Sequence, residues 1–247
     1  MAEHKRRNLK KEKLKAAVRL GFDIDAIASL ASLGRQEQLD ILSASSIARR
    51  AGADSIVAHV VSKPIEENLS KLCKTKGETW LKITHDSDVL KAALQSSPSA
   101  ICFVSRIDGR PGPVKIAENI IKALGKAVAD VKKTGISVGI SINPEAVSLR
   151  QARSLGVDFV EICAAEYSHA ANKKNAEEEL EQLQLAVYLA YELDLKAWVG
   201  CGLNFENVRA VSQIPHLSGV NVGFSIIAHS LFWGLKSAIG EMKILIS

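Results

Sequence analysis

Eight short apolar runs, each followed by a segment of helical periodicity, constrain the fold of this 247-residue chain more than any other feature. The runs are rich in Val and Ile, and Gly, Asp, Asn or Ser residues bound them. This alternation is typical of parallel strands that are joined by helices, which cover the sheet. We predict strands at 19–25, 55–61, 79–84, 100–105, 137–143, 159–164, 196–202 and 219–224, and a long helix at 173–193.

The number of runs favours an α/β fold of one particular kind, the closed (β/α)8 or TIM barrel. An open, doubly wound sheet also alternates, but it normally has about five or six strands and often a GxGxxG turn after the first. The chain contains no GxGxxG, and its length is close to the roughly 250 residues that are typical of the barrel. We therefore predict a single barrel domain at 18–247.

The net charge of +5 comes from the N-terminal end of the chain. Residues 1–17 carry seven Lys or Arg residues and two Glu residues, whereas acidic and basic residues balance in the remainder. A basic arm that binds nucleic acid is one interpretation. However, the segment has no Phe, Tyr or Trp to stack on a base. We favour a flexible, solvated extension and expect no nucleic-acid partner.

The remaining composition bears on location and on cofactors. No run approaches the roughly 18 consecutive apolar residues of a membrane span, and no apolar segment follows the charged N-terminus as in a signal peptide. The four cysteines have no CxxC spacing, so we predict neither a disulfide nor a zinc site. We expect a cytoplasmic protein with no membrane partner, no metal and no cofactor.

Candidate site residues lie at the ends of the predicted strands, because reactive groups in such barrels come from the C-terminal strand ends. Asp23 and Asp25 have the i, i+2 spacing that places both carboxylates on the inner side of a strand. Gly202 and Gly223 lie at the ends of strands seven and eight, where backbone N–H groups can bind phosphate. Further polar side chains belong to strands two, three and six: His59, Lys82 and Glu161.

Longer stretches from residue 19 onward resemble one family of barrel enzymes. They are LGFDIDAIASL, ARRAGADSIVAHV, LKIT, GVDFVEI and, most specifically, GCGLNFENVRAVSQIPHLSGVNVGFSIIAHSLFWGLKSAIGEMKIL. The chain is similar to pyridoxine 5′-phosphate synthases, which close the pyridine ring in one route to vitamin B6. The resemblance implies a (β/α)8 barrel, a phosphorylated small molecule as ligand, and a homo-oligomer, which is an octamer in that family.

The resemblance also implies roles for individual residues. The family's strand-two His, an acid–base catalyst, is matched by His59, and Glu161 is kept. The family's strand-three Glu, which works as a second base, is replaced by Lys82, and the acidic His of its GHGL motif by Cys201. We take these four residues as candidate catalytic residues. The substrate-binding candidates are Asp23, Asp25, Arg35, Gly202, Gly223 and Phe224.

Two further departures lie around this site. The Arg that follows the strand-two His by two residues in the family is Val61 here, and the His after the second glycine is Phe224. The family's long lid after strand four is replaced by a shorter loop at 106–113, rich in Gly and Pro.

Lys82 and its neighbours allow alternative interpretations. A desolvated lysine can form a Schiff base with a carbonyl substrate, but buried charges are normally paired, so we favour ion pairs with Asp23, Asp25 or Glu161. The same carboxylates and His59 can converge on a divalent metal, which the charge of Lys82 disfavours. Cys201 can act as a nucleophile near an anion site, and we favour an inert packing role.

Ring closure needs groups that give and take protons near pH 7, and each such group typically contributes about 10²- to 10⁴-fold. Two of the three that the resemblance implies are replaced. We therefore expect a divergent member that binds a phosphorylated small molecule and lacks the ring-closing activity. One alternative is an active synthase or a lysine-dependent enzyme that acts on a sugar phosphate. Another is a non-catalytic oligomeric scaffold.

Overall fold

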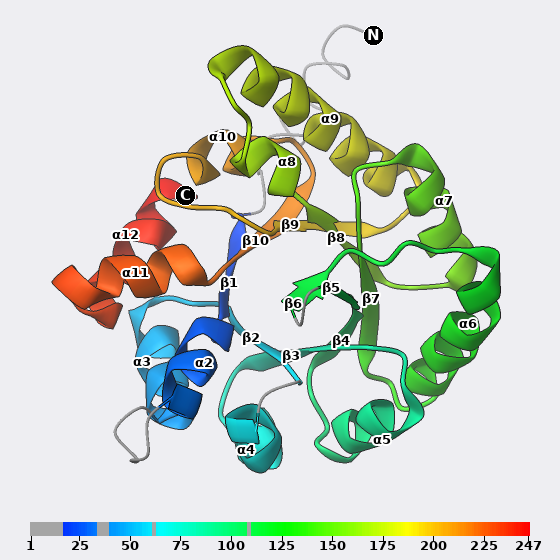
Figure 1. Cartoon of the computed structure of the whole chain (residues 1–247), viewed down its shortest axis with the longest axis horizontal. Helices are drawn as coiled ribbons and strands as arrows, with labels where there is room; N and C mark the ends of the chain where they lie inside the picture. Colours follow the sequence, from blue (N-terminus) through cyan, green and yellow to red (C-terminus); the bar gives the residue numbers. More distant parts are fainter. Residues whose placement is uncertain (1–16, 34–39, 61–62, 108–109) are drawn as a thin grey trace, which may run out of the picture.

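The computed structural model describes residues 17–33, 40–60, 63–107 and 110–247. Eight parallel strands close into a barrel in the order β1-β10-β9-β8-β7-β4-β3-β2 (Figure 1). These strands are β1 Arg19–Asp23, β2 Ser55–His59, β3 Glu78–Ile83, β4 Ala100–Phe103, β7 Ser137–Ile142, β8 Phe159–Cys163, β9 Lys196–Gly200 and β10 Leu217–Val222. The predicted (β/α)8 barrel is confirmed. The basic extension falls outside the described residues, so its boundary stays a prediction.

All eight predicted strands are present, and their bounds differ from the prediction by one or two residues. The prediction for the first strand was too long, because Asp25 is the first residue of a helix. The backbone N–H of Asp25 donates to Oδ1 of Asp23 at 3.0 Å. This local hydrogen bond offers the backbone an alternative to the strand ladder, so the strand ends at Asp23.

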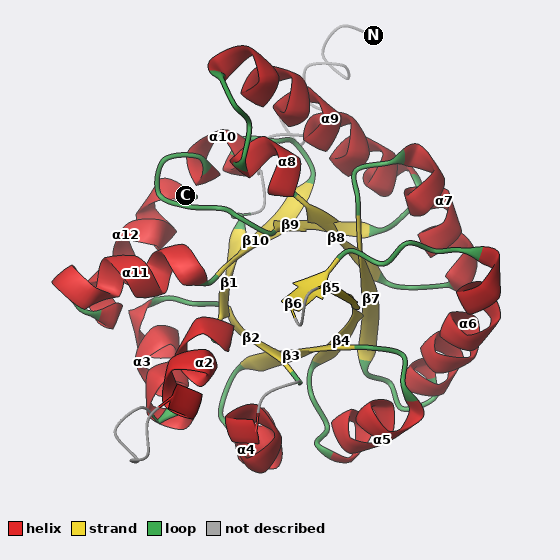
Figure 2. Cartoon of the chain, viewed as in Figure 1, coloured by secondary structure: helices red, strands yellow, loops and turns green. Residues whose placement is uncertain are grey.

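Helices surround the ring of strands (Figure 2). They are α2 Asp25–Leu33, α3 Ile41–Ala51, α4 Lys63–Lys74, α5 Ser87–Gln95, α6 Glu118–Lys132, α7 Ala146–Leu155, α8 Ala165–Ser168, α9 Lys173–Glu192, α10 Val208–Ser212, α11 Phe224–Trp233 and α12 Leu235–Leu245. The long helix predicted at 173–193 is α9, which ends one residue earlier. Within the described ranges, no helix combines the length and the apolar composition that crossing a membrane requires.

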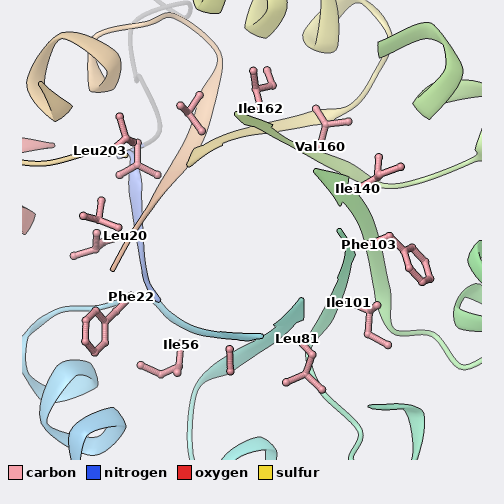
Figure 3. Packing of buried hydrophobic residues seen from close by; sticks show 14 of the residues in the cluster. Leu20, Phe22, Ile56, Leu81, Ile101, Phe103, Ile140, Val160, Ile162 and Leu203 are labelled. Carbon is pink, nitrogen blue, oxygen red and sulfur yellow. The ribbon is translucent and has the colours of Figure 1, made fainter. Parts of the chain in front are cut away.

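Side chains alternate between the two faces of the strands. Large apolar side chains such as Leu20, Ile56 and Ile101 point out of the ring toward the helices and are fully buried (Figure 3). A separate cluster around the rings of Trp80, Phe159 and Trp198 is also buried. The Trp80 ring centroid lies 4.6 Å from that of Phe159 and 4.4 Å from that of Trp198. The barrel is therefore a packed core rather than a pore.

The segment after β4 forms an antiparallel hairpin, β5 Ser105–Ile107 and β6 Arg110–Gly112. Sequence reasoning expected only a loop here. The hydroxyl of Ser105 donates to the carbonyl of Pro113 at 2.7 Å and holds the base of the hairpin together. In Figure 2 the hairpin projects over the centre of the ring. Because it follows the C-terminal end of β4, it lies at the mouth where the candidate site is expected.

The aromatic packing inside the barrel predicts that an added side-chain atom lowers the free energy of unfolding. A Cβ atom at Gly139 would overlap the ring of Phe159, so Gly139→Ala should lower the free energy of unfolding by about 1–3 kcal/mol. Gly125→Ala is the matched control, because its Cβ would lie 3.5 Å from Cδ2 of Leu155, an ordinary contact. In the interior of α6 the control should be neutral or stabilising by up to about 1 kcal/mol. Urea unfolding measures both, and equal effects would contradict the packing account.

Candidate active site

A buried ion cluster occupies the barrel interior in the C-terminal half of the strands. Nζ of Lys82 lies 3.0 Å from Oε1 of Glu161 and 3.2 Å from Oδ2 of Asp23. Nδ2 of Asn221 donates to the same Oε1 of Glu161 at 3.1 Å. Lys82 and Glu161 are only 5% and 1% exposed. We call these four residues the Lys82 cluster.

Strand periodicity explains why these side chains meet. Lys82 follows Trp80 by two residues, and Glu161 follows Phe159 by two, so each continues the inner face of its strand. A Cβ atom at residue 200 would overlap Oε1 of Glu161, so Gly200 on the neighbouring strand leaves the space that this carboxylate fills.

The ion pairs fix the protonation state of Lys82. Burial by itself lowers the pKa of Lys82, but the carboxylates of Glu161 and Asp23 outweigh it and raise that pKa well above the ordinary value. The amine is thus protonated near neutral pH and has no free electron pair for a carbonyl carbon. The structure contains the ion pairs that we favoured with Asp23 and Glu161, and it disfavours the Schiff-base alternative.

Asp25 and His59 lie beside the Lys82 cluster. The backbone N–H of His59 donates to Oδ1 of Asp25 at 2.8 Å. Burial, and then the neighbouring carboxylate of Asp23, raise the pKa of Asp25 well above its ordinary value. The sequence predicted that the carboxylates of Asp23 and Asp25 both face the barrel interior. Asp25 belongs to helix α2 rather than to the strand, but its carboxylate still reaches this site.

His59 is a buried histidine whose ring has no hydrogen-bond partner in the described part of the chain. The residue is 1% exposed, and neither Nδ1 nor Nε2 hydrogen-bonds to a described residue. Burial lowers the pKa of His59 from 6.5 to about 4, so the imidazole is neutral near pH 7. An unsatisfied buried polar group typically costs about 1–3 kcal/mol. Toward the residues that the structure describes, the ring thus leaves one donor and one acceptor unsatisfied.

Cys201 directly follows β9 and contacts a second cysteine. A side-chain hydrogen bond with Cys163, and then burial, raise the pKa of Cys201 well above its ordinary value. Because the thiol rather than the thiolate is favoured, the geometry does not support Cys201 as the activated nucleophile.

The loops after β9 and β10 contain the two candidate phosphate contacts. Gly202 has φ of +84°, and Gly223 immediately precedes α11 as its N-cap. Their backbone N–H groups donate to no described residue. Phe224, the first residue of α11, is 79% exposed. Arg35 and Val61 lie outside the described residues.

Two contributors were missed by sequence reasoning. Asn221 donates a hydrogen bond to Glu161 within the Lys82 cluster, and Cys163 is the neighbour of Cys201. The two-residue alternation from Gly219 would have placed Asn221 inside, but no local signal pairs the two cysteines. Across the described residues, no group of three or more His, Cys, Asp or Glu side chains is arranged to hold a metal ion.

The fold and the cluster define a (β/α)8-barrel protein with a buried polar site in the C-terminal half of its strands. The model of the family described as "Pyridoxal phosphate biosynthesis protein PdxJ" matches residues 20–247. The chain therefore belongs to the PdxJ family, in agreement with the resemblance found in its sequence.

Individual relatives span nearly the same length. Pyridoxine 5′-phosphate synthase of Elusimicrobium minutum is 33% identical over 233 residues, which are 92% of this chain and 96% of the relative. That of Sulfurihydrogenibium sp. is 31% identical over 237 residues, with coverages of 92% and 96%.

Solved structures of lower identity share the fold. A 4-hydroxy-2-oxoglutarate aldolase/2-deydro-3-deoxyphosphogluconate aldolase from TTHB1 has a TM-score of 0.65 at 13% identity, and the match covers 96% of this chain and 98% of that one. A 3-hexulose-6-phosphate synthase has a TM-score of 0.61 at 14% identity, with coverages of 94% and 100%. At these identities the likeness concerns the barrel alone.

Removal of the cation from the Lys82 cluster tests the importance of its ion pairs. Lys82→Met leaves the Asp23 and Glu161 carboxylates without their cation, so the free energy of unfolding at pH 7 should fall by about 3–5 kcal/mol. The matched control is Lys132→Met, whose partner Asp158 lies 3.0 Å away in a half-exposed pair. That change should cost less than about 1 kcal/mol. Comparable losses in urea unfolding would show that the Lys82 cluster does not act as a buried ion network.

The lowered pKa of His59 predicts a pH dependence of stability. Between pH 6.5 and about 4, His59 is protonated in the unfolded chain but neutral in the folded chain. The contribution of His59 to folding stability therefore falls as the pH falls. The contribution of His59 to this loss should reach about 3 kcal/mol. Asp25, whose pKa is raised, contributes with the opposite sign, so the informative quantity is the difference between wild type and His59→Gln.

We expect His59→Gln to lose less stability than wild type over this window in urea titrations. The pH dependence of His85→Gln, a change in the loop before α5, should match that of wild type. Parallel curves for wild type and His59→Gln would rule out a buried neutral His59.

Proposed function

We propose that this chain binds a phosphorylated small molecule at the mouth of the barrel and does not perform the ring closure from which its relatives are named. The observation that carries the proposal is the Lys82 cluster. An ammonium held by Glu161 and Asp23 occupies the position where the family resemblance implies a carboxylate base. A protonated lysine cannot accept a proton, so this position cannot supply the second base.

The phosphate end of the ligand is proposed to lie at Gly202 and Gly223. Both N–H groups are free of described acceptors, and Gly223 begins α11, whose N-terminus carries partial positive charge. Among the described residues, no side chain caps this helix end. Free backbone donors at a helix N-terminus are a favourable setting for a phosphate.

The rest of the ligand is proposed to extend toward His59. This ring has an unpaired donor and an unpaired acceptor, and it lies beside the carboxylate groups of Asp23 and Asp25. The β5–β6 hairpin over the mouth is suited to shield a bound molecule from water. A ligand with hydroxyl or carbonyl groups fits this polar wall.

A catalytic function remains the second candidate, and the neutral His59 favours it. A neutral imidazole with free nitrogens is the ordinary form of a general base. Such an enzyme would use His59 alone among the three acid–base positions, either in an altered synthase reaction or in another reaction of a sugar phosphate.

Self-association is proposed through α11 and α12. Large apolar side chains on these helices are exposed, namely Leu231 by 74%, Phe232 by 80%, Trp233 by 65% and Ile244 by 75%. Contiguous exposed apolar side chains of this size commonly mark an interface between proteins. Together with the family resemblance, these exposed side chains support a homo-oligomer. Separately, we propose a cytoplasmic location.

Calorimetric titration, which measures binding, and urea unfolding with added ligand, which measures stabilisation, test the phosphate site. Glycerol 3-phosphate and pyridoxine 5′-phosphate are the probes, with glycerol and pyridoxine as unphosphorylated controls. A phosphate ester at 100 times its Kd should add about 2.7 kcal/mol to the free energy of unfolding. Gly202→Ala, whose Cβ would lie 2.6 Å from Cβ of Ser168, should weaken binding. Gly156→Ala shares a positive φ, +79°, in open space away from the mouth and should bind as wild type does.

Two outcomes would overturn the proposed function. The absence of any response to inorganic phosphate and to both esters would remove the phosphate site and favour the scaffold alternative. Growth of a pyridoxine-requiring bacterium that expresses this chain would show that ring closure survives.

A further inference from the structure

Two cysteines from neighbouring strands meet at the mouth of the barrel. Cys163 is the last residue of β8 and is 7% exposed, and Cys201, which is partly exposed, directly follows β9. The register pairs Cys163 with Gly200, and the N–H of Ala164 donates to the carbonyl of Gly200 at 2.8 Å. Adjacent strands lie about 4.8 Å apart. Cys201 is the residue after Gly200, the direct neighbour of Cys163, a placement compatible with the roughly 4.4–6.8 Å separation of Cα atoms that a disulfide needs.

The backbone at Cys201 directs the two side chains toward each other. In a regular strand residue 201 would point to the opposite face from residue 200, away from Cys163. Cys201 instead has φ of +69°, a left-handed conformation that is uncommon for a residue with a side chain. This turn breaks the alternation and brings the thiol of Cys201 within hydrogen-bonding reach of the thiol of Cys163.

The four cysteines differ in reactivity. The hydrogen bond from Cys201 lowers the pKa of Cys163, which favours its thiolate. Burial raises the pKa of Cys73 to about 11. Burial, and then the carboxylate of Glu161, raise the pKa of Cys102 well above its ordinary value. Because the thiolate is the form that oxidants attack, Cys73 and Cys102 serve as internal controls.

We propose that Cys163 and Cys201 form a reversible dithiol–disulfide pair that a hydroperoxide oxidises. The Cys163 thiolate attacks one peroxide oxygen, the O–O bond breaks, and protonation of the leaving oxygen releases water when the oxidant is hydrogen peroxide. The resulting sulfenic acid of Cys163 is attacked by the sulfur of Cys201, and the S–S bond forms as a second water leaves. In sum, two thiols and one hydrogen peroxide give one disulfide and two water molecules.

The cross-link would join the end of β8 to the loop that contains Gly202. Oxidation would thereby fix the residue next to a proposed phosphate contact, and a thiol reductant would release it. The pairing of the two cysteines does not depend on the proposed function, because the mass of the chain reports it whether or not any ligand binds.

Mass spectrometry of the full chain tests the pair. The protein is treated with hydrogen peroxide, denatured, alkylated with iodoacetamide and digested. We expect two alkylated cysteines, Cys73 and Cys102, in place of four, and a peptide in which Cys163 is joined to Cys201. Dithiothreitol should restore all four free thiols. The pair should be oxidised at least about tenfold faster than Cys73.

Variants separate this pair from unspecific oxidation. Cys201→Ser should form no disulfide, and dimedone should trap the sulfenic acid on Cys163. Cys73→Ser is the matched control and should form the disulfide as wild type does. Four alkylated cysteines after oxidation, a disulfide between two chains, or equal oxidation rates at Cys73 and Cys163 would each overturn the proposal.

Discussion

The alternation of side chains across eight parallel strands is the constraint on which the rest of the molecule depends. Residues that face outward meet the helices and are apolar, whereas residues that face inward fill the barrel in layers. An aromatic layer around Trp80, Phe159 and Trp198 fills one level. Because the next inward residues on β3 and β8 are Lys82 and Glu161, opposite charges meet in a space that excludes water.

That enclosure determines the chemistry of the site. A buried charge is tolerated when it is paired, and Lys82 is paired twice, so its charge is fixed rather than available for proton transfer. His59 stands in contrast, because it is buried with neither ring nitrogen bonded to a described residue. Lys82 is thus held by ion pairs within the protein, whereas the ring of His59 has no hydrogen bond to the described residues.

Membership of the PdxJ family bears on the fold of the chain, whereas the geometry of the site bears on its chemistry. The family match covers residues 20–247 and so nearly all of the barrel. We propose that Lys82 stands where the family resemblance implies an acid, which would change the sign of one charge in the interior. A charge reversal of this kind would alter which protonation states the site can hold.

The sequence by itself determined the barrel, its eight strands to within two residues, and the level of the barrel at which Asp23, His59, Lys82 and Glu161 lie. These features follow from periodicity along the chain, which is local information. Only the tertiary structure decided that Lys82 pairs with Asp23 and Glu161, that Asn221 joins them, and that Cys163 meets Cys201. Each of these contacts joins residues 38 or more positions apart in the chain. Such contacts depend on strand register, barrel closure and one left-handed backbone conformation, none of which a local pattern specifies.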